Sequence, residues 1–218
     1  MKISNDTIEV LKNFAGINTN ILIREGSSLS TISTGKNIFA KAEVKETFPK
    51  EFAIYDLNSL LSLLTLMDDI DVDFGDESLK VTKGSSVFEY FYADPNIIVT
   101  APDKSIEVDQ FFQFDLTKDD IDMIMKAAAI TAAPMLSVVG KGGEVIITVG
   151  DPSTPKSNSF RQVIGTTDKE FDARLAVENF KIIPANYTVT LSQKKFMYLE
   201  SSKSELKYWL ALERSSVI

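Results

Sequence analysis

The sequence predicts an α+β protein of two tandem, similar domains, because three observations indicate that one pattern of elements occurs twice. The segment 3–17 recurs as 116–130 with its apolar residues in register, and each copy opens with a hydroxyl residue that can cap a helix. The segment 52–58 recurs as 171–177. A glycine-centred hairpin is expected after each first helix, at 24–27 and at 140–143. Such a repeat implies two domains of about 110 residues.

The first half begins with a helix, expected from about Asn5 to Ala15 with Ser4 as its N-cap. Its apolar face is expected to contain Ile3, Thr7, Val10, Leu11 and Phe14. A second helix is expected at 57–66. The expected strands are 21–24, 29–33, 38–45, 52–55, 69–74, 79–82 and 87–92. These elements form two strand–helix–three-strand units, the first with only a minimal leading strand.

Residues 94–110 are expected to connect the halves, because they contain Pro95, Pro102 and charged residues around the short apolar run 97–99. We place domain 1 at 1–108 and domain 2 at 109–218. The second half contains the β-α-β-β-β unit two times. Its first helix, 118–129, follows a capping-box pattern of Thr117 and Asp120. A shorter helix is expected at 176–183, before Pro184. The expected strands are 111–115, 136–139, 145–149, 159–164, 171–175, 187–192, 196–200 and 206–213, with a turn or loop at 151–158.

Composition excludes several classes of site. The 218 residues contain no cysteine and no histidine, so disulfides, thiolate metal sites and histidine general bases are excluded. No signal peptide and no apolar run of about 20 residues is seen, so we expect a soluble cytoplasmic protein. The formal net charge of −8 argues against wrapping nucleic acid with the whole surface, yet leaves a local basic face possible.

Candidate catalytic patterns have simpler explanations. The segment 69–75 resembles a calcium loop, but its glycine is one position late and Lys80 stands at the twelfth position. Read as a strand, it places three aspartates on one face. The segment 140–143 lacks the spacing of a phosphate-binding loop, and Asp119, Asp120 and Asp122 suit the start of a helix. We therefore expect no enzyme, no cofactor and no metal.

Several patches resemble the DNA sliding clamps, in particular the processivity clamps of T-even-type bacteriophages. They are the segments 2–7, 11–18, 53–58 and 93–95, and the order of elements agrees along the whole chain. The resemblance implies the DNA-clamp fold, with helices on one face of antiparallel sheets. It also implies a homotrimeric ring that encircles double-stranded DNA without sequence specificity and holds the replicative DNA polymerase. Such a ring is opened by an ATP-dependent clamp loader, in the host cell cytoplasm if the chain is viral.

In such a ring, the residues expected to face DNA are Lys2, Lys12, Lys118, Lys126 and Lys181. The alternative is a solvated helix face of mixed charge, because the same helices contain acidic residues. A groove for a partner peptide is expected at Ile97, Ile98, Val99 and Pro102. The alternative is that these side chains pack onto their own domain. Two other functions stay open: a duplicated virion or scaffold assembly protein with no DNA role, and a carboxylate-metal enzyme.

Overall fold

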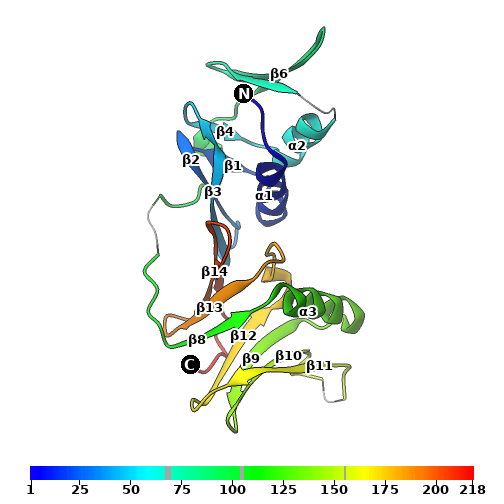
Figure 1. Ribbon diagram of the computed structural model, residues 1–218, viewed down its shortest axis with the longest axis vertical. Helices are drawn as coiled ribbons and strands as arrows, with labels where there is room; N and C mark the ends of the chain where they lie inside the picture. Colours follow the sequence, from blue (N-terminus) through cyan, green and yellow to red (C-terminus); the bar gives the residue numbers. More distant parts are fainter. Residues whose placement is uncertain (67–69, 104–105, 155) are drawn as a thin grey trace. The chain divides into compact units, whose positions relative to one another are not determined.

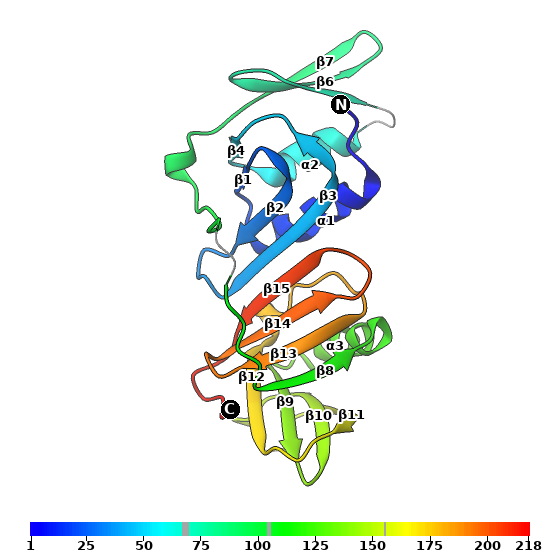
Figure 2. The same cartoon turned by 60° about the vertical axis from the view of Figure 1, so that its left-hand side comes forward.

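The computed structural model describes residues 1–66, 70–103, 106–154 and 156–218. It divides into two compact units, Met1–Lys104 and Ser105–Ile218, hereafter unit 1 and unit 2. Figure 1 shows helices against one side of the strands in each unit, and Figure 2 shows the open edges of the sheets. All strand pairs described below are antiparallel, as the sequence predicts.

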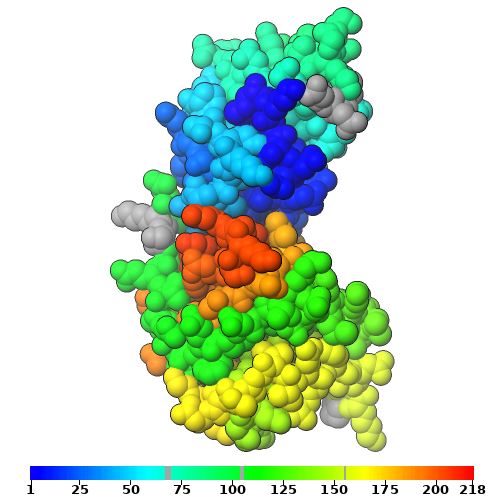
Figure 3. All heavy atoms as spheres, viewed as in Figure 1, coloured from blue at the N-terminus to red at the C-terminus, as the bar shows by residue number. Residues whose placement is uncertain are grey.

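Unit 1 begins with helix α1 (Asn5–Ile17), whose N-cap Ser4 accepts a hydrogen bond from the backbone N–H of Thr7. The predicted helix is confirmed, and Thr7, Leu11 and Phe14 of its predicted face are buried, but Ile3 is only half-buried and Ala15 and Ile17 are buried as well. Ile8 is buried, whereas Val10 is only half-buried. Helix α2 (Leu57–Thr65) is capped by Asp56 and packs against α1 through its leucines. In the space-filling view α1 lies at the surface of its unit, in dark blue (Figure 3).

The predicted hairpin at 24–27 is wrong. Strand β1 (Ile21–Ile23) pairs with β4 (Phe52–Ile54), while β2 (Gly26–Ile32) pairs with β3 (Ile38–Phe48). Gly26 has φ +109°, a conformation that side-chain-bearing residues rarely adopt, so the chain changes direction here without forming a ladder between β1 and β2. The remaining sheet of unit 1 has the order β5 (Asp71–Phe74), β6 (Ser78–Lys83), β7 (Ser86–Phe91).

The minimal leading strand of unit 1 is a single residue. The amino group of Met1 donates to the carbonyl of Val72 on β5 (2.6 Å), and the N–H of Val72 donates to the carbonyl of Met1 (2.8 Å). In unit 2 the corresponding place is filled by the whole strand β8 (Phe112–Leu116), which pairs with β13 (Tyr187–Ser192). The repeat is therefore visible in the backbone pairing.

Unit 2 contains helix α3 (Lys118–Thr131), whose capping box of Thr117 and Asp120 is formed as predicted. Strands β9 (Met135–Lys141) and β10 (Glu144–Gly150) form the predicted hairpin, with Gly142 and Gly143 at positive φ in its two-residue turn. The order of this sheet is β11-β10-β9-β12, with β11 at Phe160–Thr166 and β12 at Phe171–Ala176. The second sheet of unit 2 contains β8, β13, β14 (Phe196–Ser201) and β15 (Leu206–Ala211) as consecutive neighbours in that order.

The helix predicted at 176–183 is wrong, because only a 3-10 turn forms, at Val177–Asn179. No side chain caps this turn, and further on the backbone of Ile183 is bound elsewhere. Its N–H donates to the hydroxyl of Tyr208 (3.1 Å), and its carbonyl accepts from the hydroxyl of Tyr187 (2.6 Å). Phe180 and Ile182 are buried and the intervening Lys181 is exposed, which is the alternation of an extended segment.

Candidate nucleic-acid interface and partner surface

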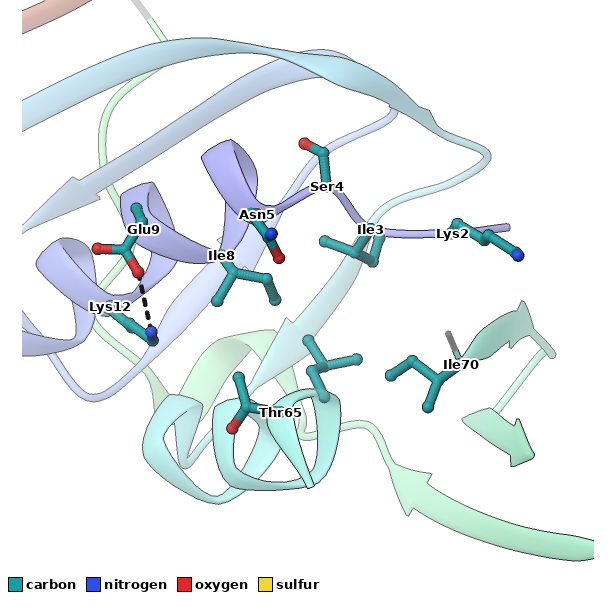
Figure 4. A pocket seen from close by; sticks show the side chains of 10 residues that line it. Lys2, Ile3, Ser4, Asn5, Ile8, Glu9, Lys12, Thr65 and Ile70 are labelled. Carbon is teal, nitrogen blue, oxygen red and sulfur yellow. Dashed lines mark hydrogen bonds and ion pairs between the residues drawn. The ribbon is translucent and has the colours of Figure 1, made fainter. Parts of the chain in front are cut away.

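Two of the predicted DNA-facing lysines, Lys2 and Lys12, line one pocket of unit 1, with a volume of about 640 Å³. Figure 4 shows Lys12 and Glu9 projecting from α1 beside Thr65 of α2, with Lys2 just before the helix. Lys12 is exposed and donates to a carboxylate oxygen of Glu9 at 2.8 Å. An exposed pair of this kind contributes little to stability, yet it weakens the field that Lys12 presents to an anion.

The two lysines on α3 differ in their surroundings. Lys118 lies 3.6 Å from a carboxylate oxygen of Asp122, one turn further along the helix. Lys126 is exposed, and within the described ranges it has no ion-pair partner. It is therefore the residue of this group whose charge is least neutralised by a neighbour.

Lys181 does not lie on a helix. It is exposed in the extended segment that follows the 3-10 turn Val177–Asn179. Acidic residues occur on the same surfaces, at Asp6, Glu9, Asp119, Asp122 and Glu178. The helix surfaces consequently have mixed charge, and sequence-independent attraction to phosphates there is expected to be weak.

The connector presents its apolar residues unevenly. Its first residues form a 3-10 turn, Pro95–Ile97, in which Asp94 accepts a hydrogen bond from the N–H of Asn96. Ile97 is 63% exposed, and Val99 and Pro102 are also exposed. Ile98 is only 8% exposed and packs into a cluster with Leu22, Ala53 and Ala93. Of the predicted groove residues, Ile98 thus packs onto its own unit and the other three face outward.

Two residues that the sequence reasoning missed bind the connector. The carboxamide of Asn18 donates to the carbonyl of Val99 (3.4 Å), and the guanidinium of Arg24 donates to the carbonyl of Ala101 (3.0 Å). Both contacts join residues more than 70 positions apart, so no local pattern predicts them. A weak signal existed, because a carboxamide at the end of a helix commonly binds backbone groups.

A second missed feature is the open edge of each unit. Strand β7 is exposed along almost its whole length and carries Val87, Phe88 and Phe91 at the surface. Strand β11 is the outer strand of its sheet and exposes Val163. The signal in the sequence is that 86–91 has apolar residues on both faces of an edge strand, which is unfavourable in water unless another chain covers it.

The other chemistry considered gains no support. Asp71 and Asp73 are exposed on β5 while Val72 is buried, as the strand reading predicts; Asp69 lies outside the described residues. Among the residues described, no group of three or more acidic side chains is placed to hold a metal ion. Over those same ranges, no helix has the length and apolar character needed to cross a membrane.

Comparison with known proteins gives consistent matches. The family model described as DNA polymerase processivity factor matches residues 4–100. The sliding clamp of Vibrio phage KVP40 is 32% identical over 98% of this chain and 99% of its own length. The sliding clamp of Escherichia phage RB69 is 29% identical over 99% of this chain and 98% of its own.

Solved structures agree in fold. PCNA from Thermococcus kodakaraensis superposes with a TM-score of 0.69 at 14% identity, covering 97% of this chain and 98% of that one. The DNA polymerase III beta chain from Streptococcus pneumoniae gives a TM-score of 0.70 at 11% identity, covering 98% of this chain and 64% of that one. At such identities the likeness shows the fold alone, and it confirms the predicted α+β clamp architecture.

Proposed function

This chain belongs to the sliding clamp family of DNA polymerase processivity factors, and on that premise we propose that it closes as a ring around duplex DNA and tethers the replicative DNA polymerase. The observation that carries the proposal is the 32% identity to a phage sliding clamp over nearly the whole of both chains. A ring that is threaded by DNA is retained topologically, so it needs no tight contact with the bases. Weak contacts with phosphates then allow it to slide.

We propose that the ring is a homotrimer built head to tail from two different patches. The first patch is the exposed edge of β7 in unit 1, with Val87, Phe88 and Phe91. The second lies at the edge of unit 2, where Val163 of β11 is exposed. Because these patches differ, their contact is heterologous, and repeated contacts of this kind close into a ring when the rotation permits. An exposed apolar edge strand is also suited to pair with another strand.

Helix α3 extends the second patch. The side chain of Gln162 on β11 donates to a carboxylate oxygen of Asp120 at 2.6 Å, which places this side of α3 beside β11. Met123 lies one turn from Asp120, and Ile130 two further turns along the same stripe; both are exposed, Ile130 to 82%. We propose that the neighbouring chain's β7 covers this apolar stripe together with Val163.

We propose that the two clamp domains are 1–108 and 109–218, a division that falls a few residues after the one between units 1 and 2, and that their helix surfaces face DNA. The DNA-facing residues are then Lys12, Lys118 and Lys126 on the helices, together with Lys2 just before α1 and Lys181 in the extended segment after the 3-10 turn. An acidic chain, with net charge −8, would discourage DNA from binding the outer surface. This distribution of charge favours DNA passing through the ring over DNA wrapping around its outer surface.

We further propose that a separate ATP-dependent loader opens the ring. The glycines at 142 and 143 form a hairpin turn and not a phosphate-binding loop, so ATP hydrolysis is assigned to a partner. The polymerase is proposed to dock at the connector, where Ile97, Val99 and Pro102 are exposed. The chain is proposed to work in the cytoplasm of the host cell.

Two measurements test this function. The mass of the purified chain in solution should be that of a trimer at micromolar concentration. After loading, the protein should stay on circular DNA and be lost from linear DNA with open ends, and polymerase processivity should rise only in the retained case. A chain that stays monomeric at high micromolar concentration, or that is retained equally on open linear DNA, would contradict the ring. Assembly without any effect on polymerase would favour a scaffold protein instead.

A further inference from the structure

The connector is fixed to unit 1 at three residues within the four-residue stretch 98–101. The side chain of Ile98 is buried against Leu22 and Ala53, on β1 and β4. The next residue, Val99, is held through its carbonyl by Asn18, and Ala101 is held through its carbonyl by Arg24. The anchors therefore combine one apolar plug with two hydrogen bonds from side chains.

Asn18 is a buried residue whose side chain makes several hydrogen bonds besides the one to the connector. It is 5% exposed, and its carboxamide nitrogen also donates to the carbonyl of Ile32 on β2 (2.9 Å), while its oxygen accepts from the N–H of Asn20 (2.9 Å). Its own backbone N–H donates to the carbonyl of Phe14 at the end of α1 (2.8 Å). One buried residue thus joins the end of α1, the end of β2 and the connector.

Arg24 supplies the second contact from the residue directly after β1. Its side chain is half-buried, and its guanidinium also lies 3.8 Å from a carboxylate oxygen of Glu51. The planar guanidinium can donate in several directions at once, so it can hold both the acid and the Ala101 carbonyl. The two anchors act on alternate residues, 99 and 101, which fixes the rotation of the chain between them.

The internal repeat provides a comparison within the same chain. In each unit a late segment of the chain forms an isolated β-bridge to an earlier strand. Ala93 pairs with Ala53 of β4 in unit 1, and Val217 pairs with Asp172 of β12 in unit 2. The position that corresponds to Asn18, extending the repeat of 3–17 with 116–130, is Thr131. Its hydroxyl donates to the carbonyl of Ala127 (2.8 Å) inside its own helix. The carboxamide that binds the late segment therefore occurs only at Asn18 of this pair of positions, in unit 1, where the late segment continues as the connector.

We propose that Asn18 and Arg24 are positioning residues for the partner surface: they fix the connector so that Ile98 stays buried while Ile97 and Val99 face outward as one apolar ridge. This rests on the proposed docking of the polymerase at the connector. The ligand is an apolar peptide segment of the polymerase, because the ridge offers aliphatic side chains and the nearby carbonyls of Val99 and Ala101 are already bound. Release of either anchor lets the chain rotate and divides the ridge.

The test uses the full trimeric chain and the replicative DNA polymerase of the same replication system. Asn18→Thr places the residue of the corresponding position in unit 2, and Arg24→Ala removes the second anchor. We expect each to weaken polymerase binding about fivefold, the amount that one lost hydrogen bond represents. Amide hydrogen exchange at 97–101 should rise, while solution mass and exchange in β13 and β14 remain as in the wild type. Arg24→Lys keeps one donor and should restore most of the affinity.

Two outcomes separate this inference from the function on which it rests. Ile97→Ser and Val99→Ser remove the ridge itself. If they weaken polymerase binding while Asn18→Thr and Arg24→Ala change neither binding nor exchange, the positioning role is wrong and the docking surface stands. If Ile97→Ser and Val99→Ser leave binding unchanged, the docking surface at the connector is wrong, and the positioning role falls with it. Because Arg24 is only half-buried, its variant keeps the test valid should Asn18→Thr fail to fold.

Discussion

The carboxylate of Glu46, on strand β3, accepts hydrogen bonds from the hydroxyl of Thr7 and from the backbone N–H of Ser4, and thereby holds the start of α1. Glu46 is 8% exposed and Thr7 is buried, so the contact is shielded from water. A negative group at this end of a helix also interacts favourably with the helix dipole. The position of α1, which carries Lys12, therefore depends on an acid from a strand almost 40 residues away.

Glu46→Gln is expected to destabilise unit 1 by about 1–3 kcal/mol at neutral pH, because a charged acceptor of two hydrogen bonds is replaced by a neutral amide. The urea concentration at the midpoint of unfolding, measured for the wild type, for Glu46→Gln and for the control variant Glu43→Gln, checks this. Glu43 lies on the same strand but is exposed, so its variant should unfold close to the wild type. Equal effects of the two changes would contradict a special role for the buried acid.

The same residue predicts a pH dependence. Burial raises the pKa of Glu46, but the hydrogen bonds from Thr7 and Ser4 outweigh it, and the pKa is lowered overall. A lowered pKa in the folded state means that the contribution is present above the unfolded value of about 4.3 and is lost as the pH falls through the folded value. The stability difference between wild type and Glu46→Gln should therefore shrink on acidification below about pH 4. A difference that is constant from pH 7 to pH 3 would show that the charge is not involved.

Tyr208→Phe is expected to cost about 1–3 kcal/mol, because the backbone N–H of Ile183 would lose the hydroxyl that accepts its hydrogen bond. Tyr208 is fully buried, so water has little access to replace the partner. Thermal unfolding should show a lower midpoint, with unit 2 affected first. Tyr198→Phe is the control, since Tyr198 is only half-buried. If both variants unfold like the wild type, the Ile183 contact does not stabilise the extended segment.

These contacts explain which parts of the fold the sequence could predict. Helices α1 and α3 were predictable because their caps, Ser4 and Thr117, and their apolar spacing are local. The helix expected at 176–183 was not excluded by any local signal, because the tyrosines that bind Ile183 come from strands β13 and β15. Sequence patterns describe a segment's own preference, whereas distant hydroxyls decided its conformation here.

The candidate site divides in the same way. The exposed lysines could be selected by their residue type, but not the ion pair that neutralises Lys12 or the absence of one at Lys126 among the described residues. In the apolar run 97–99, no periodicity indicates which residue is buried. Ile98 is the buried one because it packs with Leu22 and Ala53, which are remote from it in sequence.

Phe88→Glu is expected to turn the proposed trimer into monomers, because it places a charge on the exposed apolar edge of β7. Met123→Glu, on the other patch, should have the same effect, since a heterologous contact fails when either side is changed. Mass determination in solution checks both, with circular dichroism to show that the fold is kept. Ile97→Glu is the control: Ile97 is also exposed and apolar but lies on the connector, and its variant should remain trimeric. A monomer from Ile97→Glu, or a trimer from both edge variants, would show that the chains assemble through other surfaces.

Replacing Lys12, Lys118, Lys126 and Lys181 together with Ala is expected to reduce retention on DNA and processive synthesis, and the difference from the wild type should be largest at low salt, because salt already screens the lost contacts at high concentration. The change removes four positive charges per chain from the proposed DNA-facing surface, whereas exposed lysines contribute little to folding, so assembly and melting temperature should stay near those of the wild type.

The ion pairs predict an order among single variants. Lys126→Ala should have a larger effect than Lys12→Ala, because Glu9 already neutralises much of the charge of Lys12. Lys203→Ala, an exposed lysine in the turn between β14 and β15, should have no effect. Intact activity on DNA combined with lost assembly in the fourfold variant would place these lysines between subunits and not around the duplex.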